Sequence, residues 1–378
     1  MEVLTVKIGL LGAGTIGFGV VELADQTNDL KIIKILDRRD IPELRDRLTT
    51  EPDDILENPE IDTVIELLGG VEPAFTWVSK ALLSGKNVVT ANKFMVSEKL
   101  PELLEAAEKS GAQLRFSAAV GGGIPILVNL LRARRADEVL EVGGILNGTT
   151  NYILTKMTED GLDFDVALKQ AQELGYAEAN PTADISGGDA LCKIALASSL
   201  AWNGIVDKHT VPCEGITHIT AEDTKAAEAL GYTCKLLARA VRNGDSICAT
   251  VEPTLVKTGS VAAGIRLVEN MAYWKGQNAG IQRFTGAGAG RYATAYAVLN
   301  DLMDMNGSGL AFSVSNRELT VDASAAARSY LVRGLDLPGK HSGAWTLTDK
   351  VAPATVHALA AQAAANGEAP FFAAIMDD

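Results

Sequence analysis

The stretch VKIGLLGAGTIG, residues 6–17, joins an apolar strand pattern to a complete GxGxxG motif. In such a motif the first glycine permits a tight turn, the second lets the backbone approach a pyrophosphate, and the third allows close packing of the following helix. The N–H groups that begin this helix are free to bind an anion. Because a predicted strand precedes the motif and a predicted helix follows it, we interpret it as a dinucleotide site, although a packing turn without a ligand can have the same glycines. The residues predicted to contact the cofactor here are Gly12, Gly14, Thr15, Ile16 and Gly17.

The residues that follow continue an alternation of short strands and helices. Continuous apolar runs, rather than alternating ones, predict strands that are buried on both faces. Strand, helix and strand recurring in this order predict a Rossmann-type doubly wound parallel sheet. The expected strands are 6–12, 31–37, 62–69, 86–92 and 112–120, and the expected helices are 16–26, one that ends at Ser84, and 98–110.

The sequence changes character after Gly143, where the pattern indicates a mixed α+β domain and then a short tail. A strand with a polar end, GGILNGTTNYIL, is expected to open the second domain. A Gly-rich loop at 285–290 is expected to precede another helix. The remaining expected helices are 164–174, 188–201, 223–241, 293–304 and 353–366, and the remaining expected strands are 246–256, 268–276, 329–335 and 371–376.

We therefore expect an α/β fold in three parts. A dinucleotide-binding domain would span 1–143 and be completed by about 286–310. A substrate-binding and dimerisation domain would span 144–285, and a short C-terminal extension 311–378. The tail from Asn306 onward has space for only one strand, one helix and another strand.

The end of the second predicted strand bears on the choice of coenzyme. Asp37 lies about 20 residues after the glycines, where an acid hydrogen-bonds the ribose hydroxyls and favours NAD. Arg38 and Arg39 follow at once, and either guanidinium could instead grip a 2′-phosphate. The sequence thus contains elements for both NAD and NADP. We slightly favour NADP over NAD, and a solvated charge cluster is the alternative interpretation of the arginines.

The composition excludes several classes of function. With 47% hydrophobic residues and 22% charged residues, the 378-residue chain is typical of a globular protein of two or three domains. A net charge of −14, with 34 basic against 48 acidic residues, argues against nucleic-acid binding. The four cysteines lack CxxC spacing, which favours core thiols in a reducing cytoplasm. The N-terminus, with Glu2, lacks a secretion-signal pattern, and no apolar run approaches the roughly 20 residues of a membrane span.

The segment GYAEANPTADISGGDALCK, residues 175–193, carries the densest chemistry. A Gly/Pro-rich loop holds Glu178 and Asp184, and a predicted helix then carries Asp189 and Lys193. These last two residues are four apart, so they share one helical face and can point together into a cleft. A surface salt bridge has the same spacing. Because an apolar run follows Lys193, we expect a buried helix and favour a functional pair.

Taken together, these motifs closely resemble homoserine dehydrogenases over about residues 6–304. The resemblance rests on the glycine turn and on five further motifs in the same order, which are TANK at 90–93, AVGGGIP at 119–125, GILNGTTNYIL at 144–154, the 175–193 segment and GAGAG at 286–290. It implies NAD- or NADP-dependent interconversion of L-aspartate 4-semialdehyde and L-homoserine, on the pathway to threonine and methionine. It also implies a homodimer built largely by the sheet of the second domain.

The resemblance assigns roles to individual residues. Lys193 is the expected proton donor, poised through Asp189, and Lys93 is expected near the nicotinamide as an orienting group or second proton carrier. The substrate amino group requires carboxylates, and the carbonyl oxygen requires a proton donor as hydride arrives. The resemblance places substrate binding at Glu178, Asp184, Tyr176 and Thr149, and a loop closing over the nicotinamide at Gly288 and Gly290.

The chain departs from the family pattern at Ser117, at Asn180, which replaces the usual Asp and is expected to be tolerated, and in its tail. The family usually has Glu at position 117, where it helps to hold Na⁺ or K⁺, and this chain has Ser117. A hydroxyl brings no negative charge, so only the carbonyls of Val120 and Gly122 could contribute to a cation site. Many family members also continue into a full ACT domain, whereas the tail here has the length of an ACT remnant, which makes a threonine feedback site unexpected.

Two other functions fit the same motifs. A paralogous dehydrogenase could act on another amino-acid carbonyl, as Ser117 suggests. A nicotinamide-binding sensor could keep the fold without catalysis, but intact Lys93, Asp189 and Lys193 argue against it.

Overall fold

The structure is a computed structural model that describes residues 5–305, 310 and 312–376. Glu2, Asn306 and Ala311, which entered the predictions about the N-terminus and the tail, lie outside the described residues. The chain divides into two compact units, and each is described by itself. Unit 1 comprises Met1–Ala136, Ser199–Ile205 and Ala287–Glu318, and unit 2 comprises Asp137–Ser198, Val206–Gly286 and Leu319–Asp378. The expected domain limits remain predictions, because a domain is also defined by its capacity to fold alone.

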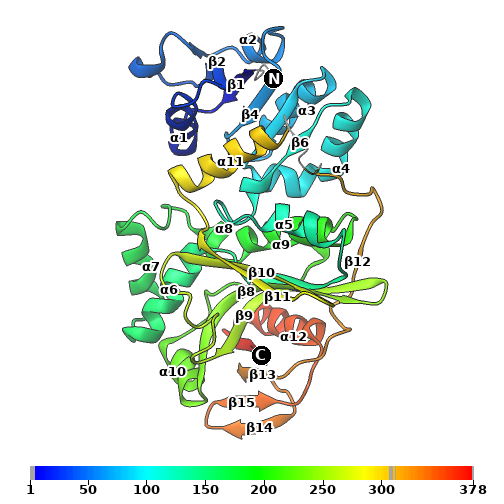
Figure 1. Cartoon of the computed structure of the whole chain (residues 1–378). Coiled ribbons are helices and arrows are strands. Elements are labelled where there is room, and N and C mark those ends of the chain that lie inside the picture. The colour runs from blue at the N-terminus through cyan, green and yellow to red at the C-terminus, as the bar shows by residue number, and fades with distance from the viewer. Residues whose placement is uncertain (1–4, 306–309, 311, 377–378) are drawn as a thin grey trace. The chain divides into compact units, whose positions relative to one another are not determined.

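Unit 1 contains a six-stranded sheet in the order β3-β2-β1-β4-β5-β6, in which every neighbouring pair is parallel (Figure 1). This is the strand order of a Rossmann-type sheet, in which ligands bind beyond the carboxyl ends of the strands. The prediction of a doubly wound parallel sheet is confirmed. The strands are β1 Val6–Leu11, β2 Leu30–Leu36, β3 Leu48–Thr49, β4 Thr63–Glu66, β5 Asn87–Thr90 and β6 Leu114–Arg115.

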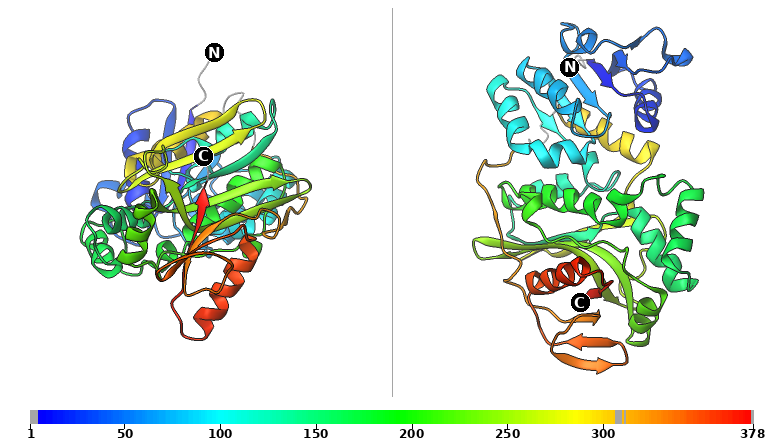
Figure 2. Two further views of the ribbon diagram at one scale, coloured as in Figure 1. Left: turned by 90° about the horizontal axis from the view of Figure 1, so that it is seen from below. Right: turned by 180° about the vertical axis from the view of Figure 1, so that it is seen from behind.

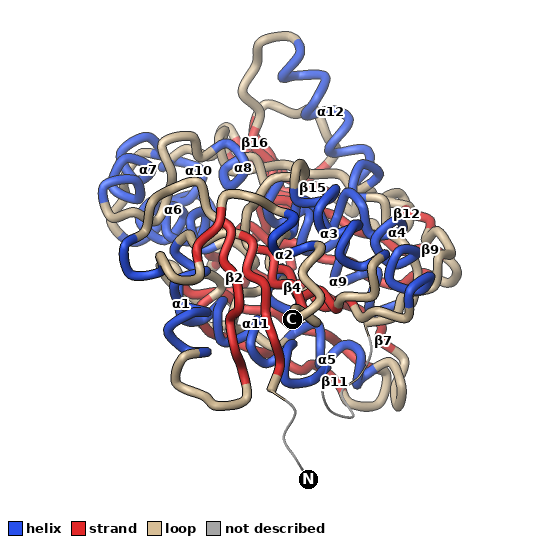
Figure 3. The backbone as a smooth tube through the Cα atoms, turned by 90° about the horizontal axis from the view of Figure 1, so that it is seen from above, coloured by secondary structure: helices blue, strands red, loops and turns tan. Residues whose placement is uncertain are grey.

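Helices accompany this sheet, as the blue segments around strands β2 and β4 in Figure 3 show. The last of them, α11, comes from the far end of the sequence and packs against α1. The α-helices of unit 1 are α1 Thr15–Ala24, α2 Asp53–Leu56, α3 Ala74–Leu83, α4 Lys93–Ser110, α5 Ile126–Ala133 and α11 Arg291–Met305, and the 3₁₀ turns are η1 Pro42–Leu44 and η2 Ser117–Ala119.

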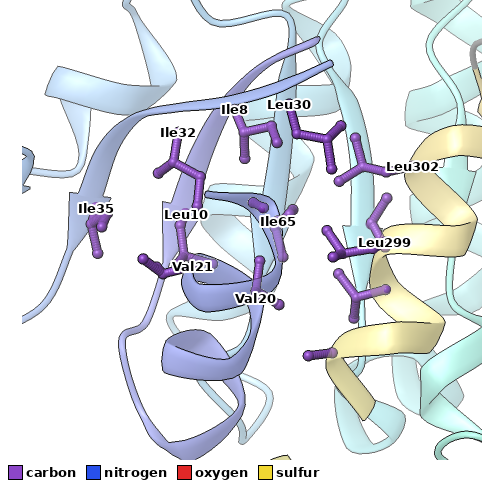
Figure 4. Close-up of a cluster of buried hydrophobic side chains, with 14 of the residues drawn as sticks. Ile8, Leu10, Val20, Val21, Leu30, Ile32, Ile35, Ile65, Leu299 and Leu302 are labelled. Atoms are coloured by element: carbon purple, nitrogen blue, oxygen red, sulfur yellow. The ribbon is translucent and has the colours of Figure 1, made fainter. Parts of the chain in front are cut away.

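One core cluster of unit 1 lies between the sheet and the pair α1 and α11. Most of its side chains come from strands β1, β2 and β4 and from both helices, and nearly all of them are aliphatic (Figure 4). Residues such as Ile8, Leu10 and Ile65 are completely buried. Because Leu299 and Leu302 of α11 belong to this cluster, strands β1, β2 and β4 depend on a segment that follows them by more than 200 residues in the sequence.

Strand β3 and helices α2 and α5 of unit 1 were not predicted, and two predicted elements have clearly different bounds. Helix α4 begins at Lys93 rather than at Glu98, because the side chain of Asn92 accepts a hydrogen bond from the Met95 N–H and caps it. The strand expected at 112–120 is only two residues long, and the 3₁₀ turn η2 follows it.

Unit 2 is built on one large sheet in the order β11-β10-β7-β8-β9-β16-β13-β15-β14, with β12 paired to β9. The expected mixed α+β character is confirmed. The strands are β7 Val139–Ile145, β8 Tyr232–Asn243, β9 Ser246–Lys257, β10 Glu269–Gly276, β11 Gly280–Ala287, β12 Thr320–Val321, β13 Tyr330–Arg333, β14 Gly339–Ser342, β15 Trp345–Thr348 and β16 Phe371–Met376. The helices are α6 Gly148–Glu159, α7 Phe164–Glu173, α8 Thr182–Ile185, α9 Gly188–Trp202, α10 Ala221–Ala229 and α12 Pro353–Ala365, with the 3₁₀ turn η3 Lys208–Thr210.

Only the first three residues of the strand expected at 143–154 lie in a strand. Strand β7 ends at Ile145, and helix α6 begins three residues later. The side chain of Asn147 accepts a hydrogen bond from the Thr150 N–H, so it caps a helix inside the segment that was expected to be a strand.

The helix expected at 223–241 is correct only as far as Ala229. Helix α10 has a capping box made by Thr220 and Asp223 and ends at Ala229, and Gly231 follows with a φ of 83°. The chain then forms the long strand β8, which pairs antiparallel with both β7 and β9. Pairing on both sides outweighs the helical preference of the Leu and Ala residues in this segment.

The tail is larger than predicted, because the structure adds β12, β14 and β15 to the expected strands and helix. Strand β16 pairs parallel with β9, so the tail extends the sheet of unit 2 (Figure 2). Buried Glu252 of β9 helps to anchor it, because its carboxylate lies 3.0 Å from the Arg328 guanidinium and 2.9 Å from Nε2 of His357 in α12. Within the described residues, no helix is long and apolar enough to cross a membrane.

Candidate functional site

The glycine turn of unit 1 has the geometry that a pyrophosphate requires. The Gly12 N–H donates to the Leu36 carbonyl at 2.9 Å, which fixes the turn to strand β2. A Cβ on Gly17 would lie 2.2 Å from the Gly12 carbonyl oxygen, so only glycine fits there, whereas a Cβ on Gly14 would meet nothing within 4 Å. Helix α1 starts at Thr15 with no side-chain cap, and Ile16 follows in its first turn. The open space at Gly14 therefore meets the uncapped N-terminus of a helix, which suits an anionic ligand.

Asp37 lies beside this turn and is heavily hydrogen-bonded. Its carboxylate accepts the Ala13 N–H at 3.0 Å and the Arg39 guanidinium at 2.8 and 2.9 Å. The hydrogen bonds from Arg39 hold the pKa of this carboxyl well below its usual range. Arg39 also donates to the Ala13 carbonyl at 2.7 Å, and Arg38 is exposed. Asp37 and Arg39 thus form one pair at the ribose end of the turn.

Lys93 is the first residue of helix α4, directly after the carboxyl end of strand β5. Its ammonium lies 5.0 Å from the centre of the Phe94 ring. The loop before it is held by buried Glu66 at the end of β4, which accepts hydrogen bonds from Thr90 at 2.5 Å and Asn92 at 3.3 Å. Burial raises the pKa of Glu66. Lys93 is therefore fixed at the carboxyl edge of the sheet, where a Rossmann-type fold binds its coenzyme.

The glycine loop 120–123 follows strand β6 and η2 at the same edge. Ser117, expected to weaken a cation site, donates both its N–H and its hydroxyl to Asp301 of α11, each at 2.7 Å. Burial raises the pKa of Asp301 to about 6. The described residues contain no group of three or more His, Cys, Asp or Glu side chains that could hold a metal ion.

Residues 287–288 of the GAGAG segment contact the glycine loop 120–123. The Gly123 N–H donates to the Ala287 carbonyl at 3.2 Å, and the Gly288 carbonyl lies directly against Gly122. Gly290, with a φ of 121°, precedes helix α11. These two glycine-rich segments are therefore in contact within unit 1.

Unit 2 contains the predicted carboxylate–lysine pair. Lys193 of α9 donates to the Asp189 carboxylate at 2.7 Å and to the Leu146 carbonyl at 2.6 Å. Both side chains are buried, at 9% and 3% exposure, so this is not a surface salt bridge. An ammonium has three N–H donors, and no described residue accepts the third. The lysine is therefore held by two acceptors and has a donor left for a ligand.

Asn147 connects this pair to the substrate-binding acids expected from the sequence. Its side-chain amide donates to Asp184 at 2.7 Å and to Asp189 at 2.9 Å, while its oxygen caps helix α6. One amide thus joins a residue of α8 to a residue of α9. The sequence reasoning missed Asn147, although an Asn followed by Gly-Thr-Thr is a recognisable helix N-cap.

Three further predicted residues lie in the same unit. The Thr149 hydroxyl donates to the Tyr176 carbonyl at 2.6 Å, so these two are adjacent, and the Tyr176 side chain packs 5.2 Å from the Tyr152 ring. Glu178 is exposed in the loop before α8.

The sequence analysis did not single out Glu66 and Asp301 of unit 1. The signal for Glu66 was an acid at the end of an otherwise apolar strand.

The comparisons with known proteins agree across both units. A family model for homoserine dehydrogenase matches residues 125–303, and a model for the NAD-binding domain of homoserine dehydrogenase matches residues 12–117. The homoserine dehydrogenase of Synechocystis sp. is 41% identical over 320 residues, which cover 80% of this chain and 74% of that protein. The enzyme of Bacillus subtilis is 39% identical over 312 residues, covering 79% and 72%.

Solved structures give the same result. The crystal structure of a homoserine dehydrogenase from Thiobacillus denitrificans matches with a TM-score of 0.88 and 32% identity, covering 99% of this chain and 98% of that one. The homoserine dehydrogenase of S. aureus at pH 6.5 matches with a TM-score of 0.78 and 28% identity, covering 99% of both chains. The chain therefore belongs to the homoserine dehydrogenase family of NAD(P)-dependent oxidoreductases.

Proposed function

We propose that the protein interconverts L-aspartate 4-semialdehyde and L-homoserine with lysine acid–base catalysis. The observation that carries this proposal is the buried ammonium of Lys193, which keeps one N–H donor for a ligand while Asp189 and the Leu146 carbonyl hold the other two. When bound, the nicotinamide supplies or accepts the hydride. The protein must then provide a proton for the carbonyl oxygen and a site for the amino acid.

Lys193 is the proposed acid. In reduction it donates a proton to the aldehyde oxygen, and in oxidation the neutral amine takes the proton from the homoserine hydroxyl. Asp189 stabilises the charged form, and because it has only 3% exposure its influence is poorly screened by water. Asn147 keeps the Asp189 carboxylate in place through the hydrogen bond at 2.9 Å.

The substrate amino acid carries an ammonium, which requires carboxylates. We propose Asp184 and Glu178 for this role, since Asp184 is tied through Asn147 to the same network and Glu178 is open to an incoming ligand. Thr149 and Tyr176, joined by the hydrogen bond at 2.6 Å, would shape the pocket. Lys93 is proposed to orient the coenzyme or to carry a second proton, in keeping with its position at the carboxyl edge of the sheet in unit 1.

We propose NADP as the preferred coenzyme. A ribose hydroxyl bound by Asp37 would have to compete with the four N–H donors from Arg39 and Ala13. The positive charge of Arg39 also reduces the repulsion that Asp37 would exert on a 2′-phosphate. Exposed Arg38 is available to bind that phosphate. These features favour NADP without excluding NAD from the turn at Gly14.

We also propose a homodimer formed through the sheet of unit 2. Its core cluster of Leu237, Met271 and Tyr273 borders a pocket that also includes the exposed side chains of Val261 and Ile281. A second copy of the chain would cover these apolar groups. Sedimentation velocity of the wild type and of Ile281→Asp tests the dimer.

The free cysteines support the proposed cytoplasmic location, because thiols persist in a reducing compartment.

The decisive experiment is an initial-rate assay of homoserine oxidation with NADP and NAD in parallel, and with other amino alcohols of four and five carbons. We expect the highest kcat/KM for homoserine with NADP. Equal rates for the other amino alcohols would favour a paralogous dehydrogenase. Coenzyme binding without any turnover would favour a nicotinamide sensor.

A further inference from the structure

Asp301 of helix α11 is a buried carboxylate with both oxygens engaged by one residue. One oxygen accepts the Ser117 N–H and the other accepts the Ser117 hydroxyl, both at 2.7 Å. Arg115, itself 1% exposed, lies 3.8 Å from the same carboxylate and balances its charge. Hydrogen bonds to an ionised acceptor are short and strong, so this contact fixes the first residue of η2.

The same segment that supplies Asp301 also contacts the far end of the glycine loop 120–123. The Gly123 N–H donates to the Ala287 carbonyl, and a Cβ on Gly122 would lie 2.6 Å from the Gly288 oxygen. Residues 287–301 therefore hold the loop at both ends within unit 1.

The position of this loop makes its conformation relevant to coenzyme binding. Strand β6, from which it departs, is the last strand of the parallel sheet, and the loop emerges at the carboxyl end. The glycine turn at Gly14 and the loop that precedes Lys93 emerge at the same edge. In folds of this type that edge receives the coenzyme.

The residues around Ser117 do not fit a monovalent cation held by a charged side chain. The Ser117 hydroxyl donates a hydrogen bond to Asp301. The Asp301 carboxylate already accepts two hydrogen bonds and faces the guanidinium of Arg115. The approach of Gly288 fills the space next to Gly122. No described side chain therefore offers free negative charge to an ion at this place.

We infer that Asp301 is a positioning residue, and that its hydrogen bonds to Ser117, together with the Gly288 contact, fix the glycine loop for coenzyme binding without Na⁺ or K⁺. The inference rests on the proposed nicotinamide function. Hydrogen bonding within the protein takes the place of coordination, and the loop is fixed as soon as α11 packs against the sheet.

The test uses NADPH fluorescence titration of the full chain without substrate. For the wild type, the Kd should change less than twofold when Na⁺ and K⁺ are replaced by choline at equal ionic strength. Ser117→Ala should weaken binding about tenfold, because one hydrogen bond to a charged acceptor is lost. Ser117→Thr, which keeps a hydroxyl, should restore most of the affinity.

Asp304→Asn is the matched control, because Asp304 lies on the same helix and faces Arg115 at 3.4 Å but is 43% exposed. It should bind NADPH like the wild type. A merely structural role would lower the thermal midpoint of Ser117→Ala and leave the Kd of the folded protein unchanged, which would overturn the inference. A wild-type Kd that rises more than threefold in choline would overturn it as well.

A second readout separates this inference from the proposed function. The thermal midpoint of the coenzyme-free wild type should be the same in sodium, potassium and choline buffers. A higher midpoint in sodium or potassium would show a bound ion and contradict the inference, whereas wild type that binds neither NADPH nor NADH would refute the proposed function alone.

Discussion

Two pairs of an aspartate and a basic residue lie at the candidate sites of the two units, and they differ in exposure. In unit 1 the Arg39 side chain is 60% exposed and its partner Asp37 is 11% exposed. In unit 2 Lys193 and Asp189 are 9% and 3% exposed. The local chemistry is similar, but water screens the first pair and hardly reaches the second.

This difference separates recognition from catalysis. A solvent-exposed guanidinium can leave its carboxylate at little cost when a phosphate or a ribose arrives, so the unit 1 pair can adjust to its ligand. A buried pair is costly to break, because the remaining charge would be left without a partner. The unit 2 pair therefore keeps one geometry, as acid–base catalysis requires.

The largest expected effect follows from removing the buried ammonium. Lys193→Met should lower kcat for homoserine oxidation about 10²- to 10⁴-fold, because it removes the proton carrier while retaining an apolar side chain of similar length. NADPH affinity should be unchanged in a fluorescence titration. Lys156→Met is the matched control, since Lys156 pairs with Asp160 at the same i,i+4 spacing on an exposed helix face. A Lys193→Met enzyme that keeps a tenth of the wild-type kcat would contradict the assignment.

The second effect concerns stability. Asp189→Asn should lower the free energy of unfolding by about 3 kcal/mol, because the Lys193 ammonium stays buried after its counter-charge is lost. Urea unfolding measures this effect, and Asp160→Asn should show no resolvable change. The double variant with Lys193→Met should be less destabilised than the sum of the single variants. Additive effects would mean that the two charges do not interact.

A smaller effect is expected at the exposed end of the coenzyme site. Arg38→Ser should raise KM for NADP about tenfold and leave KM for NAD within twofold, because it removes a donor for the 2′-phosphate only. Arg45→Ser is a suitable control, since Arg45 is equally exposed but pairs with Asp40. Equal changes for both coenzymes would remove Arg38 from the discrimination.

The smallest effect is that of Arg39 on stability, and it depends on pH. Hydrogen bonds from Arg39 lower the pKa of Asp37 in the folded state, so their stabilisation is present above the ordinary carboxyl pKa and is lost as the pH falls through the lowered value. Arg39→Ala should lower the thermal midpoint only slightly at pH 7. The difference from wild type should shrink as the pH falls below about 4, the ordinary value of the group. A difference that grows in acid would contradict the sign of this linkage.

Local signals in the sequence were sufficient where neighbours in the chain are also neighbours in space. The GxGxxG turn and its flanking strand lie within 12 consecutive residues, and the i,i+4 pair of Asp189 and Lys193 needs only that α9 be helical. Helices α7, α9 and α12 were likewise predicted nearly to the residue. In each case short-range hydrogen bonding decides the structure.

Prediction failed where distant segments compete for the same residues. The stretch 232–241 is compatible with a helix, but as strand β8 it gains hydrogen bonds from β7 and β9 on both sides. The tail was expected to hold one strand, one helix and a second strand, and the prediction missed β14 and β15, which are short and stabilised by each other and by β13. A single sequence does not display such pairings.

The sequence by itself determined the dinucleotide turn, the parallel sheet of unit 1 and the acidic and basic residues of the substrate segment, because each depends on spacing along the chain. Only the tertiary structure decided which hydrogen bonds keep these residues in place. Asn147 donates to both Asp184 and Asp189, and Asp301 accepts a hydrogen bond from Ser117, 184 residues away in the sequence. These contacts bring together polar groups that folding removes from water, and burial is a property of the whole fold rather than of any one segment.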